Sequence, residues 1–253
     1  MRLQRSSLRF SRTANSAPCL NASVAGGDYL SSLAVVKLER NDLTRLLNEQ
    51  GDLFSARLGI ALNGLDSGEL FRWFLASLLF GARITESVAG RTYEAFAEHG
   101  LTTPERIAAA DFGELLQIMG EGGYARYDGI TSRKVQQAAA RLIEQYAGDL
   151  NMLHAAAQDT ADLEARLQEF WGVGPTTCGI FLRELRGVWP KANPPLGSLA
   201  MLASGHLGID DPRSFWEKHA VDGYDFRHFE AALTRVGKNF CRRGRCQKAP
   251  VPH

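Results

Sequence analysis

The chain has 253 residues, of which 45% are hydrophobic, enough for one good core or for two small cores that share an interface. Its formal net charge is only +1, which excludes a protein that attracts polyanions through its overall charge alone. Four cysteines at irregular spacing exclude a secreted disulfide framework, so we expect a reducing compartment.

The first residues have the composition of a leader segment. Residues 1–27 contain arginine, many Ser and Ala residues, and no acidic residue. Organelle transit peptides and disordered leaders share this composition, and an upstream start codon that adds a leader without function would also produce it. These three alternatives stay open, and we leave residues 1–32 outside the predicted fold.

Helical periodicity extends over almost the whole chain from about residue 43, and the alternation typical of strands is sustained nowhere. The sequence therefore predicts an all-α protein. The predicted helices cover residues 40–49, 54–62, 68–81, 85–98, 103–109, 111–119, 131–147, 150–157, 160–170, 175–187, 198–207, 212–219 and 225–241. The longest apolar stretch, residues 70–80, is interrupted by Arg72 and is too short to cross a bilayer, so we expect a core helix and no membrane partner.

Three helix starts carry specific signals. Thr103 is a predicted N-cap, because Pro104 and Glu105 follow it where proline and an acidic side chain favour the first turn. Asp111 is predicted to cap the next helix in the same way. Ser132 is the predicted N-cap of the most regular helix, whose apolar stripe includes Val135.

Gly172, Val173 and Gly174 separate two apolar helices. Apolar residues at helical spacing lie on both sides of this segment: Leu163, Leu167, Phe170, Cys178, Phe181, Leu182 and Leu185. The glycines allow a tight turn and leave amide N–H groups uncovered at the start of the next helix, where the helix dipole favours a phosphate. The segment predicts a helix-hairpin-helix motif that binds the DNA backbone; the alternative is a tight turn without a ligand.

The last part of the chain is basic, and residues 242–253 are predicted to be a tail. From residue 235 onward there is no acidic residue and there are six basic ones: Arg235, Lys238, Arg242, Arg243, Arg245 and Lys248. Such a segment fits contacts with phosphate groups, and it fits a solvated, frayed end equally well.

The order of these parts resembles the helix-hairpin-helix (HhH-GPD) DNA glycosylase superfamily, of which endonuclease III is the best-known member. The resemblance spans roughly residues 68–241. One branch of the superfamily is similar in two further segments, Gly-Tyr-Ala-Arg-Tyr-Asp at 123–128 and Ile-Phe-Leu-Arg-Glu at 180–184.

The resemblance implies an endonuclease III-like fold with two helical lobes and a DNA-binding cleft between them. One lobe would comprise residues 67–187 and contain the hairpin. The other would join residues 33–66 to residues 188–241. The implied partner is double-stranded DNA, bound by a monomer.

The superfamily flips a damaged or mispaired base out of the duplex and breaks its N-glycosidic bond. A carboxylate stabilises the positive charge that develops on the sugar, and bifunctional members add a lysine that forms a Schiff base. In this chain the lysine position holds Thr176 and the aspartate position holds Gly197. We therefore expect no Schiff-base lyase activity, and Asp128 and Glu184 are the candidate substitutes for the missing acid. For each of them the alternative is a solvated or salt-bridged structural carboxylate.

The resemblance also implies a set of DNA-contacting residues. They are Gly172, Val173, Gly174, Thr176, Thr177, Lys134 and Arg83, the last of which stands where endonuclease III has the glutamine that fills the gap left by the flipped base. An arginine there would stack on neighbouring bases; the alternative is a surface arginine. The aromatic residues Trp73, Phe74, Trp171 and Trp189 are predicted to be packing groups.

The cysteines near the end of the chain do not match the four-cysteine pattern of the iron-sulfur members. Cys241 and Cys246 supply only two thiolates, and each iron of a four-iron cluster needs a ligand. A zinc site of Cys241, Cys246 and His253 would lack a fourth ligand. We expect no metal and no other cofactor.

Three classes of function remain open. The first, which we favour because the superfamily is mostly enzymatic, is a monofunctional DNA glycosylase of base-excision repair, and the alternative is a catalytically degenerate relative that binds damaged or bent DNA without excision. The third is a helical module whose hairpin meets protein instead of phosphate. A bacterial protein of the first two classes would lie in the cytoplasm with the nucleoid, and organelle targeting by residues 1–27 stays open.

Overall fold

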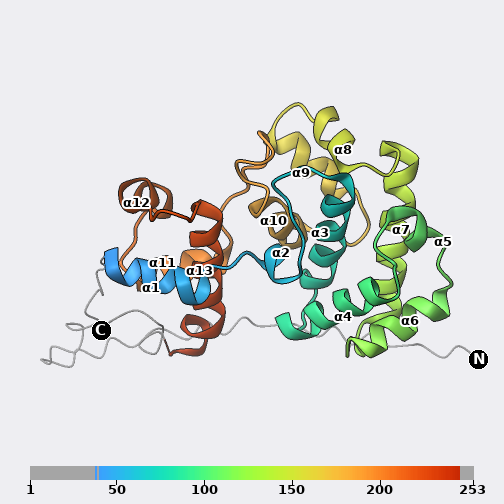
Figure 1. The fold of residues 1–253 in the computed structure, drawn as a ribbon, viewed down its shortest axis with the longest axis horizontal. Coiled ribbons are helices and arrows are strands. Elements are labelled where there is room, and N and C mark those ends of the chain that lie inside the picture. Colours follow the sequence, from blue (N-terminus) through green and yellow to red (C-terminus); the bar gives the residue numbers. More distant parts are fainter. Residues whose placement is uncertain (1–37, 39, 246–253) are drawn as a thin grey trace, which may run out of the picture. The chain divides into compact units, whose positions relative to one another are not determined.

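The computed structural model describes Leu38 and residues 40–245 (Figure 1). Over these residues it contains thirteen α-helices, one short 3-10 helix and no strand, which confirms the predicted all-α class. None of the described helices is long and apolar enough to span a membrane. The predicted leader and the part of the predicted tail from residue 246 onward lie outside the described residues.

Most helices follow one another with short connections, and the connection from α10 to α11, residues 184–197, is long. In chain order they are α1 (Arg40–Gln50), α2 (Phe54–Arg57), α3 (Ser67–Phe80), α4 (Glu86–Glu98), α5 (Pro104–Ala109), α6 (Phe112–Glu121), α7 (Asp128–Tyr146), α8 (Leu150–Ala156), α9 (Thr160–Gln168), α10 (Pro175–Arg183), α11 (Ser198–His206), α12 (Pro212–His219), α13 (Phe226–Asn239) and the 3-10 helix η1 (Cys241–Arg243).

Local capping explains two of the helix starts that the sequence predicts. Thr103 accepts a hydrogen bond from the N–H of Arg106 at 3.3 Å, and Pro104 occupies the first helical position of α5. Asp111 accepts from the N–H of Gly113 at 2.7 Å at the start of α6. Both predicted caps are confirmed.

Three predicted helices have an end that differs by three residues or more, namely α7, α2 and α10, which ends at Arg183 and not at residue 187. α7 begins at Asp128 because the N–H of Thr131 already donates to the carbonyl of Tyr127 at 2.9 Å, so Ser132 lies buried inside the helix and is not its cap. α2 ends at Arg57, well before residue 62. The reason is Gly59, which has φ +70° and whose N–H donates back to the carbonyl of Ala56.

The buried apolar side chains form two clusters, named here the large cluster and the small cluster. The large cluster is built mainly on α3 to α10, and the small cluster combines α1 with α11, α12 and α13. Figure 1 shows α1 (blue) beside α11 and α13 (orange to red), although these helices lie at opposite ends of the described chain. Three residues of the predicted 33–66 segment, Phe54, Ile60 and Leu62, pack in the large cluster. The predicted lobe boundaries stay a prediction.

Arg235 on α13 is a buried cation that holds the connection between α1 and α2. Its guanidinium donates to the carbonyl of Gln50 at 2.6 Å and to that of Asp52, and it lies over the ring of Phe54 at 3.9 Å. Burial lowers the pKa of Arg235 to about 10. The guanidinium therefore remains charged at neutral pH.

Glu86, in the first turn of α4, lies among three cationic groups. Its carboxylate is 3.9 Å from Arg57, 3.7 Å from Arg235 and 3.6 Å from Lys238. These contacts connect the start of α4 to α2 and α13. They also hold the turn between α3 and α4, which carries Arg83.

Candidate nucleic-acid interface

The segment predicted as a hairpin forms a tight turn between α9 and α10. Gly172 has φ +98°, a left-handed conformation that glycine adopts without strain. Val173 is only 4% exposed, and its N–H donates to the carbonyl of Phe170 at 2.9 Å. The side chain of Val173 therefore packs in the core and holds the turn against it. Contrary to the prediction, neither its side chain nor its amide is available to DNA.

The start of α10 has unpaired hydrogen-bond donors. Pro175 occupies the first helical position and has no N–H, and the first bonded amide is that of Cys178, which donates to the carbonyl of Gly174 at 2.9 Å. The amides of Gly174, Thr176 and Thr177 have no acceptor among the described residues. A Cβ at exposed Gly174 would have no neighbour within 4 Å, so the space in front of this residue is open.

Lys134 on α7 lies against the turn. A Cβ at Gly172 would lie 2.9 Å from Cδ of Lys134 and 3.1 Å from its Cβ, so the stem of the lysine fills the space that glycine leaves. No described carboxylate is within ion-pair distance of its ammonium group. The structure thus brings two of the predicted DNA contacts, Gly172 and Lys134, together.

The turn that carries Arg83 packs on the first turn of α10. A Cβ at Gly81 would overlap Oγ1 of Thr177, so only glycine permits this approach. Thr177 is buried, and its hydroxyl donates to the carbonyl of Gly172 at 3.5 Å. Its side chain therefore faces the protein, contrary to the prediction of a DNA contact, and its amide has no acceptor among the described residues. Arg83 is exposed, two residues beyond this contact.

Trp171 corrects the prediction that the aromatic residues are packing groups. Trp73, Phe74 and Trp189 are buried as predicted, whereas Trp171 is 41% exposed. The apolar stripe of α9 ends at buried Phe170, one residue earlier, so Trp171 falls outside it. The position of Trp171, between the last apolar residue of the stripe and Gly172, was the feature of the sequence that could have predicted its exposure.

Glu184 is not a free carboxylate. It is 1% exposed, and its two oxygens accept the N–H groups of Phe54 at 2.8 Å and Ser55 at 2.9 Å, at the start of α2. Arg183 lies over the ring of Phe54 at 4.5 Å. Glu184 therefore caps α2 from the end of α10, and the prediction that it substitutes for the catalytic aspartate is corrected.

The other positions implied by the resemblance lie at helix starts. Asp128 is the first residue of α7, is partly buried, and accepts the N–H of Gly129 at 2.7 Å. Thr176 is exposed in the first turn of α10. Gly197 is the exposed N-cap residue of α11, and a Cβ there would have no neighbour within 4 Å. Among the described residues, no hydrogen bond or ion pair joins Asp128 or Gly197 to the hairpin.

Cys178, in the first half of α10, is buried at 2% exposed. Burial raises the pKa of its thiol to about 12, so the thiolate is absent near pH 7. Its sulfur is 4.0 Å from the carbonyl of Glu164, on the inner side of α9. Cys178 is a packing group.

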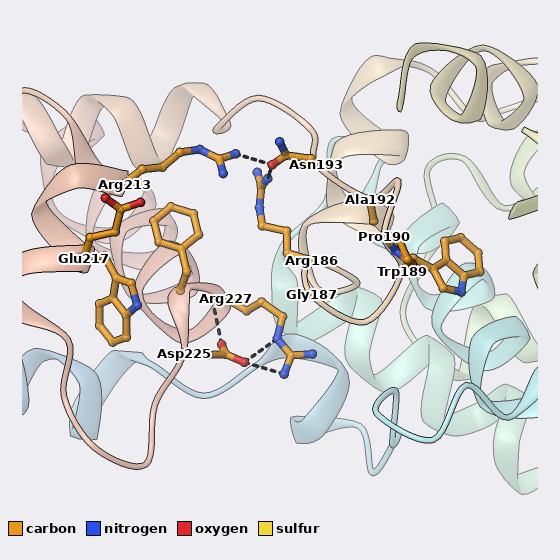
Figure 2. Close-up of a pocket in the computed structure, with 12 residues that line it drawn as sticks. Arg186, Gly187, Trp189, Pro190, Ala192, Asn193, Arg213, Glu217, Asp225 and Arg227 are labelled. Carbon is orange, nitrogen blue, oxygen red and sulfur yellow. Dashed lines mark hydrogen bonds and ion pairs between the residues drawn. The ribbon is translucent and has the colours of Figure 1, made fainter. Parts of the chain in front are cut away.

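A cavity of about 450 Å³ lies beyond the other end of α10 (Figure 2). Residues 186–193, α12 and the start of α13 line it, with Trp189, Trp216 and Phe226 among its apolar groups. α10 has nine residues, so its two ends are about 13 Å apart. The cavity is therefore distinct from the hairpin.

Two arginines of this cavity converge on one neutral oxygen. Arg186 donates to Oδ1 of Asn193 at 2.8 Å, and Arg213 donates to the same atom at 2.7 Å, as Figure 2 shows. Arg186 also pairs with buried Glu230 at 2.8 Å. Burial, and then the charge of Arg186, lowers the pKa of Arg213. Sequence reasoning missed this cluster, because its members come from separate segments and share no spacing.

No described group of three or more His, Cys, Asp or Glu side chains could hold a metal ion. Cys241 is buried in η1, whereas Cys246 and His253 lie outside the described residues.

Comparison with models of known protein families gave no match, and a search of curated proteins gave none either.

Proposed function

We propose that the protein binds double-stranded DNA through its hairpin, as a helix-hairpin-helix protein of the DNA glycosylase type. The observation that supports this most is the set of unpaired amides at Gly174, Thr176 and Thr177, with Lys134 against the same turn. Three free N–H groups at the start of a helix can donate hydrogen bonds to the oxygens of one phosphate group. A lysine beside them neutralises a neighbouring phosphate, and the exposed Arg83 extends the basic surface.

Within this proposal, binding without excision is the better supported activity. The lysine position holds Thr176, the aspartate position holds Gly197, and the carboxylate of Glu184 is occupied by α2. Loss of one stabilising group of this kind commonly lowers a rate by about 100-fold to 1000-fold. Monofunctional glycosylase activity is the second candidate, and Asp128, at the start of α7, is the acid that remains for it.

The binding proposal is tested by the fluorescence anisotropy of a labelled duplex of about 20 base pairs over a range of salt concentrations. A phosphate-binding protein loses affinity steeply with added salt. Gly174→Ala adds a methyl group, in open space and without a clash, to the residue that carries one of the free amides, and we expect its Kd to rise about tenfold. Gly64→Ala is the matched control, because Gly64 is also exposed and has no neighbour within 4 Å of an added Cβ.

Binding that does not depend on salt, or equal effects of the two glycine substitutions, would contradict the proposal and favour a hairpin that meets protein.

Excision is tested separately with duplexes that contain uracil, hypoxanthine, alkylated or oxidised bases, followed by hot alkali to reveal abasic sites. We expect no cleavage by the wild-type protein. Gly197→Asp adds a carboxylate at the N-cap of α11, where the backbone has room for it, and should raise activity. Gly197→Asn is the uncharged control. An inactive but folded Gly197→Asp protein would mean that the aspartate position has been aligned incorrectly.

A further inference from the structure

Trp171 is the exposed member of an otherwise buried set of tryptophans. Trp73 is 0% exposed, Trp189 1% and Trp216 9%, whereas Trp171 is 41% exposed. Tryptophan has a large aromatic ring system and is enriched at binding interfaces. Its exposure beside the unpaired amides of this turn makes Trp171 a candidate contact for a ligand.

The neighbours of Trp171 indicate what the partner is. Gly172 follows it directly, the stem of Lys134 packs on Gly172, and the unpaired amides begin at Gly174. The groups without a partner at this turn thus include three amide donors and one cation. A protein or lipid surface that covered Trp171 would also have to satisfy these groups, whereas nucleic acid supplies a phosphate for them and a flat base for the indole ring.

An indole ring stacks on the face of a base, not on its edge. In an intact duplex both faces of every base are covered by the neighbouring base pairs, and only the edges are open in the grooves. A free face exists where stacking is interrupted, at a gap, a bulge or an unpaired base. Breaking the stack of an intact duplex costs free energy that an already interrupted site does not require.

We infer that Trp171 is a specificity-determining residue that makes the hairpin prefer duplex DNA with an interrupted base stack. This inference rests on the proposed DNA binding and adds the substrate class to it. The free amides and Lys134 hold the backbone, and the indole ring stacks on the base that the interruption exposes. This preference requires neither the Arg83 side chain nor the exposed apolar residues other than Trp171.

The test compares one duplex in two forms, intact and with a one-nucleotide gap, by anisotropy with the full-length protein. Stacking of one base on an aromatic side chain predicts that the wild-type protein binds the gapped form about tenfold more tightly. Trp171→Ala should bind both forms equally. Trp171→Phe should retain part of the preference, because a phenyl ring still stacks.

A matched control is Met152→Ala on α8, which removes another exposed apolar side chain and should leave both affinities unchanged. Intrinsic fluorescence gives a second readout, because the other three tryptophans are buried. The gapped duplex should quench the emission more than the intact one, and the difference should vanish in Trp171→Phe.

Equal binding of the two duplexes by the wild-type protein, or a preference that persists in folded Trp171→Ala, would overturn the inference while leaving DNA binding intact. Failure to bind either duplex would instead overturn the proposed function itself.

Discussion

The two ends of α10 differ in how their polar groups are used. At the start of the helix, the amides of Gly174, Thr176 and Thr177 have no acceptor in the described part of the protein. No described carboxylate lies within ion-pair distance of Lys134. At the far end, Glu184 gives both oxygens to backbone amides of α2.

The two ends of α10 show that unpaired polar groups, and not the most reactive residue types, are the candidates for a binding site on this helix. A charged group whose bonds are all made within the protein stabilises the fold, however chemically capable it is. Donors that the fold leaves unpaired are available to a ligand. Glu184 is the more reactive group by type, yet the plain amides at the opposite end are the better candidates for a site.

The largest expected effect is at the far end of the helix. Glu184→Gln replaces one buried acceptor oxygen by an NH2 group that faces a backbone N–H, and should lower the free energy of unfolding by about 3 kcal/mol. Urea unfolding followed by circular dichroism measures this change. Glu217→Gln, at an exposed carboxylate on α12, is the control and should change stability by less than about 0.5 kcal/mol. A Glu184→Gln protein of wild-type stability would remove the contrast between the two ends.

The next effect is at the turn itself. Gly172→Ala places a Cβ at φ +98° and 2.9 Å from Cδ of Lys134, and should destabilise the protein by about 2 kcal/mol. Gly174→Ala, two residues later, should lower stability by less than about 1 kcal/mol, because it has no such clash. Thermal unfolding of the two variants, side by side, checks the difference. Equal melting temperatures would mean that the turn does not need a left-handed residue.

A smaller effect concerns the cations near the start of the helix. Lys134→Ala should weaken duplex binding by a few fold and reduce the slope of log K against log salt by about one, as for one lost phosphate contact. Lys218→Ala removes the same charge from α12 and should leave the slope unchanged. If both variants shift the slope equally, the attraction is diffuse and the start of α10 has no special role.

The smallest effect is a dependence of stability on pH near the far end. His154 stacks on Trp189 with the ring centroids 4.6 Å apart, and burial, helped by the charge of Lys191, lowers its pKa. A depressed histidine pKa means that protonation favours the unfolded state, so stability should fall as the pH drops below about 6.5. Subtracting the profile of His154→Gln isolates this contribution. An unchanged profile in that variant would show that other groups cause the loss.

Local signals made much of the fold predictable. Thr103 and Asp111 mark helix starts by their own hydrogen bonds, and the apolar stripes before and after residues 172–174 determine α9 and α10 without reference to distant residues. The prediction that Ser132 is an N-cap was wrong, because serine is common at caps but the carbonyl of Tyr127 already accepts the first helical hydrogen bond of α7. The residue type at one position does not determine where the backbone enters the helix.

The candidate site was predictable only in part. Gly172, Lys134 and Arg83 lie on three segments, and the structure supplies the contacts that bring these segments to one turn. Val173 and Thr177 failed as predicted contacts because the side of a turn that faces the core depends on what packs against it. Glu184 failed for the same reason: its partners, Phe54 and Ser55, are about 130 residues away in sequence.

The contacts of Glu86 show why a net charge of +1 says little about this protein's electrostatic potential. Arg57, Arg235 and Lys238 lie within ion-pair distance of Glu86, and Arg57 also pairs with Asp52 at 3.3 Å, so three cations meet two carboxylates near the start of α4. A locally positive field beside the turn of Arg83 would guide an approaching polyanion over distances of about a Debye length, roughly 8 Å in physiological salt. An almost neutral chain can thus present a steering field where its arginines are held in place by the fold.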